Sequence, residues 1–189
     1  MKTLINTARI KLTAAQSARL IRIDEENLDA VALLAEKDLM EKGRVPMNAE
    51  KAMYGLRQYY ALAALNPKNM HAVSLAVDPY WHAHVLHTAQ YARFCNEAVG
   101  YFMHHIPLNQ SDPEMVQAVY KVYGYSLDVL RHIFGEENVD PTCWSPDATK
   151  AEMICFHGND CGHANPESIL DASPEFANVR ETYGTLLAA

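Results

Sequence analysis

The chain has 189 residues, of which 49% are hydrophobic and 21% are charged, and its formal net charge is −7 at pH 7. This composition is typical of a globular protein with one packed core, and it excludes the low hydrophobicity of disordered chains. The acidic balance and the lack of a dense lysine or arginine run argue against nucleic acid and anionic membranes as partners.

Apolar residues repeat at helical spacing in five segments, which predicts an all-α fold. In chain order, the expected helices are residues 14–23, 24–42, 48–66, 79–98 and about 113–134. Thr13 and Gln16 have the spacing of a capping box before the first helix. Gly43, Gly100 and Gly135 are natural stops after the second, fourth and fifth helices. The short run 73–77 is either a strand or an extended connector.

Five of the nine histidines lie in one part of the chain, in Trp81-His82-Ala83-His84-Val85-Leu86-His87 and in His104-His105. If 79–98 is one helix, His84 and His87 share a stripe with Tyr91 and Cys95, and His82 lies nearly opposite His84. Clustered imidazoles suit zinc, iron, copper or nickel, and a carboxylate among the ligands favours non-haem iron. The predicted ligands of this central site are Asp78, His82, His84, His87 and one of His104 and His105.

The role of Asp78 has two interpretations. It lies one helical turn before His82, where a carboxylate fixes the tautomer of a ligating histidine. Alternatively, both side chains are ligands of one site that faces another helix. The sequence does not choose between these interpretations.

The last part of the chain is expected to be loop-rich, because prolines and glycines recur after Gly135. We therefore divide the chain into a helical domain at 1–135 and an extension at 136–189. The extension contains the pattern Cys155-x-His157-x3-Cys161-x-His163, with Cys143 as a spare ligand. Two thiols and two imidazoles suit a tetrahedral zinc ion, whose binding energy would order a segment with few apolar residues. The alternatives are solvated loop residues, a Cys155–Cys161 disulfide, or His157 or His163 completing the central site.

The central motif resembles a known family. Asp78, Trp81-His82-Ala83-His84, Tyr91 and Cys95, followed by Gly100-Tyr101-Phe102 and His104-His105, are similar to the glycine-rich domain-containing-protein-like family. The resemblance covers about residues 54–107 and implies a helical domain with functional histidines, but no particular reaction. The chain departs from the family in lacking a long glycine-rich region, and His87 stands where relatives commonly have an acidic or small residue.

These patterns together predict a metal-dependent oxidoreductase that acts on a small molecule or peptide. Iron or copper is expected at the central site, and zinc at the C-terminal cluster. Tyr91 and Cys95 are the candidate catalytic side chains, which would shape the pocket. The alternatives are a non-catalytic helical interaction module held together by structural zinc, and a metal chaperone or sensor. No segment is long and apolar enough for a signal peptide or membrane span, which predicts a cytoplasmic protein.

Overall fold

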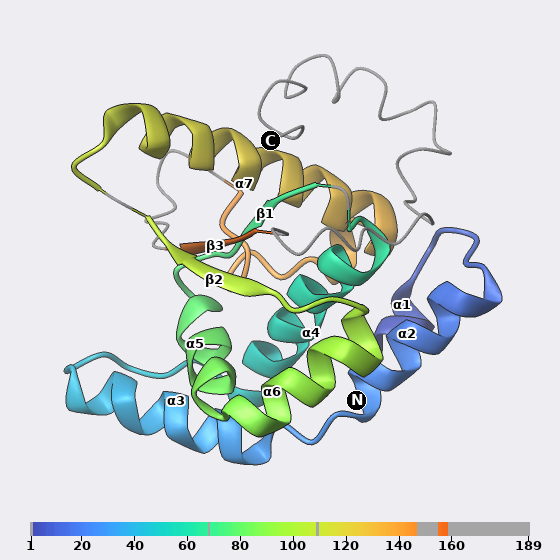
Figure 1. Cartoon of the computed structure of the whole chain (residues 1–189), viewed down its shortest axis with the longest axis horizontal. Helices are drawn as coiled ribbons and strands as arrows, with labels where there is room; N and C mark the ends of the chain where they lie inside the picture. Colours follow the sequence, from blue (N-terminus) through green and yellow to red (C-terminus); the bar gives the residue numbers. More distant parts are fainter. Residues whose placement is uncertain (1, 68, 109, 147–154, 159–189) are drawn as a thin grey trace.

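The computed structural model describes residues 2–67, 69–108, 110–146 and 155–158 (Figure 1). Its elements, in chain order, are α1 (Leu4–Thr7), α2 (Ala14–Glu25), α3 (Asp29–Glu41), α4 (Ala49–Leu65), β1 (His71–Ala72), α5 (Asp78–Leu86), α6 (Thr88–Phe94), a π-helical segment (Cys95–Val99), β2 (His104–Pro107), α7 (Pro113–Phe134), a 3-10 turn (Glu136–Asn138) and β3 (Cys155–Gly158). The all-α prediction is confirmed, since helices dominate the described residues. A small three-stranded sheet is added to them.

Helix α4 forms the centre of the core. It packs against α1, α2, α5 and α7, and in Figure 1 it runs through the middle of the molecule. Between Ala52 and Leu65 every residue except Arg57 is buried, as expected for a helix that is apolar on almost all sides. A Cβ at Gly55 would lie 3.1 Å from the Val77 side chain and 3.2 Å from that of Cys143, so these neighbours would have to shift to admit a larger residue.

Local sequence signals explain most of the helix ends. The capping box is present: the Thr13 backbone N–H donates to Gln16 Oε1 at 2.9 Å, and the Gln16 N–H donates to Thr13 Oγ1 at 3.2 Å. Gly100 and Gly135 follow helices with φ of +97° and +77°, values that glycine adopts without strain. The second helix begins at Asp29 rather than residue 24, because α2 continues to Glu25.

The expected single helix at 79–98 is wrong. The structure divides this segment into α5, α6 and the π-helical segment, and α5 and α6 run in different directions (Figure 1). The break is at His87, whose backbone has φ −82° and ψ 59°. The His87 side chain donates from Nδ1 to the Ala83 carbonyl at 2.8 Å and so satisfies the end of α5. His84 and His87 therefore do not share a continuous helical stripe with Tyr91.

The small sheet joins distant segments in the order β1-β3-β2, with both pairs antiparallel. Strand β2 lies in a segment for which the sequence predicted no helix or strand. Successive side chains on a strand point to opposite faces, so His104 and His105 are directed apart. The backbone register pairs His105 with His157 of β3, and His157 in turn with His71 of β1.

The described part of the predicted extension, at 136–146, packs into the same core as the helices. Val139, Cys143 and Trp144 are buried in that core. The Trp144 indole N–H donates to Gln58 Oε1 of α4 at 3.1 Å, and its ring lies 6.4 Å from that of Tyr59. The helical core therefore continues at least to Trp144. Residues 147–154 and 159–189 lie outside the described residues.

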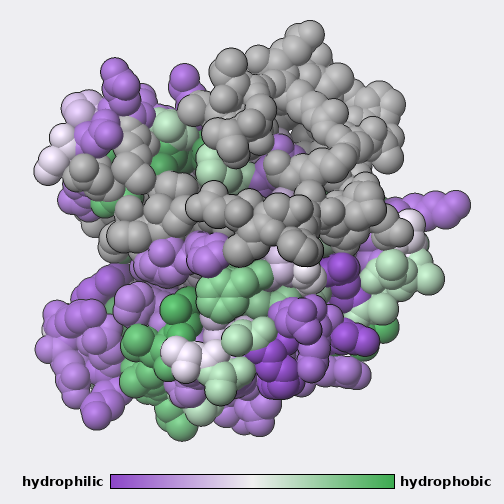
Figure 2. All heavy atoms as spheres, viewed as in Figure 1, coloured by the Kyte–Doolittle hydropathy of each residue, from purple (hydrophilic) through white to green (hydrophobic). Residues whose placement is uncertain are grey.

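The surface in this view is mixed in polarity. Figure 2 shows apolar residues among hydrophilic ones over its lower half, where α3, α5 and α6 lie. The exposed large apolar side chains include Leu33 and Met40 of α3 and Leu86 of α5. In the part of the chain that the structure describes, no helix has both the length and the apolarity to cross a bilayer.

Candidate metal centre

Three of the predicted ligands approach one another between α5 and β2. Asp78 and His82 lie one helical turn apart on α5, which places them on one side of that helix. The His105 ring from β2 lies against them: its Nε2 is 3.7 Å from Asp78 Oδ1, and its centroid is 5.3 Å from that of His82. Asp78 is 7% exposed, whereas His82 is exposed to solvent. The group is thus half-buried and open on one side.

Two polar atoms of this group are buried without a hydrogen-bond partner, namely Asp78 Oδ1 and His105 Nε2. A separation of 3.7 Å is too long for a hydrogen bond between them. Leaving such atoms unsatisfied is unfavourable by about 1–3 kcal/mol each. A polar or cationic group between the two atoms, such as a bound water or a metal ion, would satisfy both of them.

Two spacings in this group can be compared with those between ligands of one metal ion. With metal–ligand bonds of about 2.0–2.2 Å, two donor atoms on one metal lie roughly 3.0–3.5 Å apart. By the same geometry, two imidazole rings on one metal have centroids roughly 4.5–5.2 Å apart. The observed values of 3.7 Å and 5.3 Å exceed these ranges only slightly. Carboxylate and imidazole donors together suit iron, so Asp78, His82 and His105 have the donor chemistry of the predicted site.

The donor atoms are close but not converged. Among the described residues, no group of three or more histidine, cysteine, aspartate or glutamate side chains is arranged to hold a metal ion. His82 is exposed, so a change of its rotamer is opposed by little packing. Packing therefore restrains the His82 side chain less than that of Asp78, which is buried.

Trp81 and Tyr91 position the strand that carries His105. The Trp81 indole N–H donates to the Tyr91 hydroxyl at 3.0 Å, and this hydroxyl donates to the Met103 carbonyl at 2.7 Å. Met103 directly precedes β2. The Trp81 ring also packs against the His105 ring, with centroids 4.5 Å apart. These contacts hold the start of β2 against α5.

Tyr91 and Cys95, the predicted catalytic side chains, are both buried in the core. Burial raises the pKa of the Cys95 thiol to about 11, and hydrogen bonding to the Met103 backbone and to Tyr91 offsets this only in part. Burial likewise raises the pKa of Tyr91 well above its ordinary value. A protonated, buried thiol is the opposite of an activated nucleophile. In this structure Tyr91 and Cys95 lie in the core and support the candidate centre through packing and hydrogen bonds.

His84 faces the core, away from the side of α5 that carries Asp78 and His82. Its Nδ1 shares a hydrogen bond of 2.7 Å with the Tyr60 hydroxyl, and its ring lies 5.1 Å from those of Tyr91 and Phe94. Burial lowers the pKa of His84 to about 3, so the ring is neutral near neutral pH. Its Nε2 is buried without a partner. The structure does not bring His84 to the other three candidate ligands.

The remaining predicted residues lie in other places. His87 ends α5 through its bond to Ala83, and His104 packs on Phe102 with ring centroids 5.0 Å apart. Of the two adjacent histidines, His105 is the one that approaches Asp78. Cys155 and His157 lie on β3. Cys161 and His163 lie outside the described residues.

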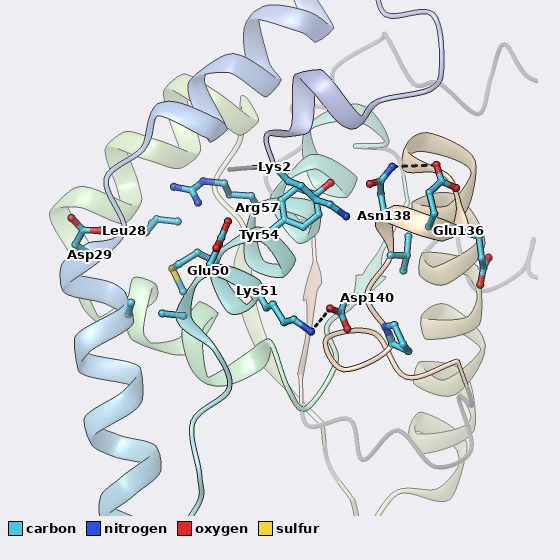
Figure 3. Close-up of a pocket in the computed structure, with 16 residues that line it drawn as sticks. Lys2, Leu28, Asp29, Glu50, Lys51, Tyr54, Arg57, Glu136, Asn138 and Asp140 are labelled. Atoms are coloured by element: carbon cyan, nitrogen blue, oxygen red, sulfur yellow. Dashed lines mark hydrogen bonds and ion pairs between the residues drawn. The ribbon is translucent and has the colours of Figure 1, made fainter.

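A separate pocket of about 750 Å³ lies between α3, the first half of α4 and the loop at 136–141 (Figure 3). Buried apolar residues such as Leu28 and Met53 form part of its wall, with charged side chains around them. One pair of these charges is an ion pair, between Lys51 Nζ and Asp140 Oδ2 at 2.9 Å. None of the predicted ligands lines this pocket. We place the candidate site at Asp78 and His105 because two buried polar atoms without a hydrogen-bond partner lie close together there.

Comparison with known proteins finds one family that is similar to the middle of the chain. Residues 33–123 are similar to the UCP032817-like family. The matched region is just under half of the chain and contains Asp78, His82 and His105. The description of this family names no activity. No curated protein and no solved structure matches the chain.

Proposed function

We propose that this protein binds a divalent transition metal, with iron preferred, through Asp78, His82 and His105, and that it is an oxidoreductase acting on a small molecule or peptide. The observation that carries the proposal is the pair of buried, unsatisfied atoms Asp78 Oδ1 and His105 Nε2, 3.7 Å apart. Two histidines and one carboxylate are the ligand set of many non-haem iron oxygenases. The resemblance to the glycine-rich domain-containing-protein-like family stays a prediction.

The protein residues have distinct tasks in this proposal. Asp78 would hold the cation through its carboxylate, whose negative charge would offset part of the charge of the cation, and His82 and His105 would bind it through their imidazoles. His82 is the exposed member, so substrate reaches the metal from that side. Tyr91 and Trp81 are positioning residues, because they fix β2 through the Met103 carbonyl. The bound metal supplies one-electron redox chemistry and open coordination positions.

The test is metal binding by the purified, untagged chain after anaerobic loading with iron(II), followed by mass spectrometric metal analysis. The wild type should retain about one equivalent, whereas Asp78→Asn and His105→Gln should bind roughly tenfold or more weakly. His104→Gln is the matched control, since His104 is the neighbouring histidine on the opposite face of β2, and it should bind like the wild type. Equal retention by all four proteins would contradict the proposed site.

Nitric oxide, used as a probe of open positions on iron(II), tests the enzymatic part. The iron-loaded wild type should give the electron paramagnetic resonance signal of an iron–nitrosyl centre, because three protein ligands leave positions open. Retention of zinc alone, lost in Cys161→Ala but not in Asp78→Asn, would support the interaction module with structural zinc instead.

A further inference from the structure

The pocket between α3, the first half of α4 and the loop at 136–141 has no part in the proposed function. Its lining includes none of Asp78, His82 and His105. Its volume of about 750 Å³ is within the roughly 300–1,000 Å³ that is usual for sites of small molecules, which combine an apolar wall with a few polar groups. The pocket therefore has the dimensions of a second ligand site.

One face of α4 lines the pocket, and the start of α3 lies beside it (Figure 3). Met53 of α4 is 9% exposed, and Leu28, directly before α3, is 2% exposed. The apolar part of the wall is one helical turn from the Glu50 carboxylate, because the lining side chains of α4 are spaced at i, i+3, i+4 and i+7. These side chains are Glu50, Met53, Tyr54 and Arg57.

The loop at 136–141 is held in place by ion pairs and by a hydrogen bond. Gln58 of α4 donates from Nε2 to the Asn138 carbonyl at 3.0 Å. Each ion pair joins a carboxylate of the loop to a cation of another segment, and three of the five carboxylates that line the pocket are paired in this way. The pairs are Glu136 with Arg131, Glu137 with Arg9, and Asp140 with Lys51.

The two other lining carboxylates belong to Asp29 and Glu50, in the first turns of α3 and α4. Neither forms an ion pair with any residue that the structure describes. Both residues are exposed, so a ligand can reach them. A carboxylate in a first helical turn is favourable by itself. The sign of the ligand's charge therefore depends on whether the cations of the wall balance these two groups.

The lining cations do not balance the two carboxylates. Arg57 donates to two carbonyls at the end of α2, those of Ile23 and Glu26, at 3.3 and 3.1 Å. Burial lowers the pKa of Arg57, and three nearby carboxylates partly offset this effect. Lys51 is already paired, which leaves Lys2 against two carboxylates. The remaining charge of the wall is negative, and a positively charged ligand complements it.

We propose that this pocket binds a small organic cation, a primary amine on an apolar body, with the ammonium group at Glu50 and the apolar body against Leu28 and Met53. The ammonium donates to the Glu50 carboxylate in a charge-assisted hydrogen bond. The apolar body loses its contact with water on binding to the wall, which is favourable. The inference goes beyond the proposed function, since it involves no residue of the candidate metal centre.

The experiment measures binding of tryptamine, an ammonium group on an indole, to the metal-free full chain by isothermal titration calorimetry. Indole-3-propionate has a similar body with a carboxylate, and it should bind roughly tenfold or more weakly. Glu50→Gln should weaken tryptamine binding roughly fivefold, the upper end of what an exposed ion pair contributes. Glu41→Gln is the matched control, because Glu41 is an exposed carboxylate at the other end of α3 and does not line the pocket.

Nuclear magnetic resonance locates the bound amine. Tryptamine should shift the backbone amide signals of residues 49–57 and 136–141, and thermal unfolding of Glu50→Gln should show that the variant is folded. The proposal is overturned if indole-3-propionate binds as tightly as tryptamine, if Glu50→Gln binds tryptamine like the wild type, or if the shifts lie elsewhere. Failure to bind tryptamine at millimolar concentration overturns it as well. None of these results affects the proposed metal site, because the protein is metal-free throughout.

Discussion

His84 is a neutral histidine in an aromatic environment, and this makes stability depend on pH. Its pKa is about 3 in the folded protein, lowered mainly by burial from an ordinary value of 6.5. Between these two values the unfolded chain binds a proton at this residue and the folded chain does not. Stability contributed by His84 is therefore fully present above about pH 6.5 and falls as the pH decreases toward 3, by at most about 1.4 kcal/mol per pH unit.

Replacing His84 tests this pH dependence. In metal-free protein, His84→Gln should show a smaller loss of unfolding free energy between pH 7 and pH 5 than the wild type, as measured by urea denaturation at both values. His104→Gln serves as the control, because His104 is only partly buried, and it should keep the wild-type dependence. If His84→Gln loses as much stability as the wild type over this interval, another group is responsible.

At the same scale, the sequence could not show which of the candidate ligands approach one another in the fold. Helical geometry correctly placed His82 and His84 on opposite sides of α5, but it did not show which side faces the core. Tyr60, the partner of His84, comes from α4 and has no signal in the motif. The choice of His105 over His104 depends on the register of β2, which residues far along the chain determine.

Among the elements, the turn at Gly100 has a strict requirement for glycine. Gly100 ends the π-helical segment with φ +97°, and a Cβ there would collide with the Arg19 guanidinium, which bonds the Val99 carbonyl. Gly43 also has a positive φ of +70°, but no atom lies within 4 Å of its would-be Cβ. Both glycines therefore have a positive φ, but only Gly100 has a neighbour that an added Cβ would contact.

Gly100→Ala should lower the free energy of unfolding by about 2–3 kcal/mol, because backbone strain and displacement of Arg19 add. Gly43→Ala is the matched control and should lower it by only about 1 kcal/mol, the cost of a non-glycine residue at positive φ. Chemical denaturation of both variants gives the comparison. Equal losses would mean that the Arg19 contact contributes nothing.

Elements with local signals were predicted well, whereas those that depend on distant partners were not. The sequence-based bounds of α2, α4 and α7 are within about two residues of the structure, because caps, stripes and stop glycines are all local. The break at His87 has no proline or glycine to mark it. The strands have two to four residues each, which is too few for a periodic pattern. Their pairing joins segments about fifty residues apart in β2 and β3 and more than eighty apart in β1 and β3.

For the whole molecule, the segment after α7 is part of the single core that supports the site. Trp144 is 1% exposed, its indole donates to Gln58, and its ring lies 6.4 Å from those of Tyr59 and Tyr123. Tyr59 in turn packs edge-on against Trp81, with centroids 5.0 Å apart, and Trp81 contacts His105. A continuous layer of aromatic side chains thus connects the segment around Trp144 to the candidate centre.

Trp144→Ala should therefore destabilise the whole helical core rather than release a peripheral loop. The expected loss is about 3–5 kcal/mol, the usual range for truncating a buried tryptophan. Leu33→Ala is the control, because Leu33 is 69% exposed, and it should change stability by less than about 0.5 kcal/mol. Urea denaturation followed by circular dichroism should show one transition in each protein, shifted only in Trp144→Ala. A wild-type helical transition in Trp144→Ala would instead show that the segment around Trp144 folds apart from the helical core.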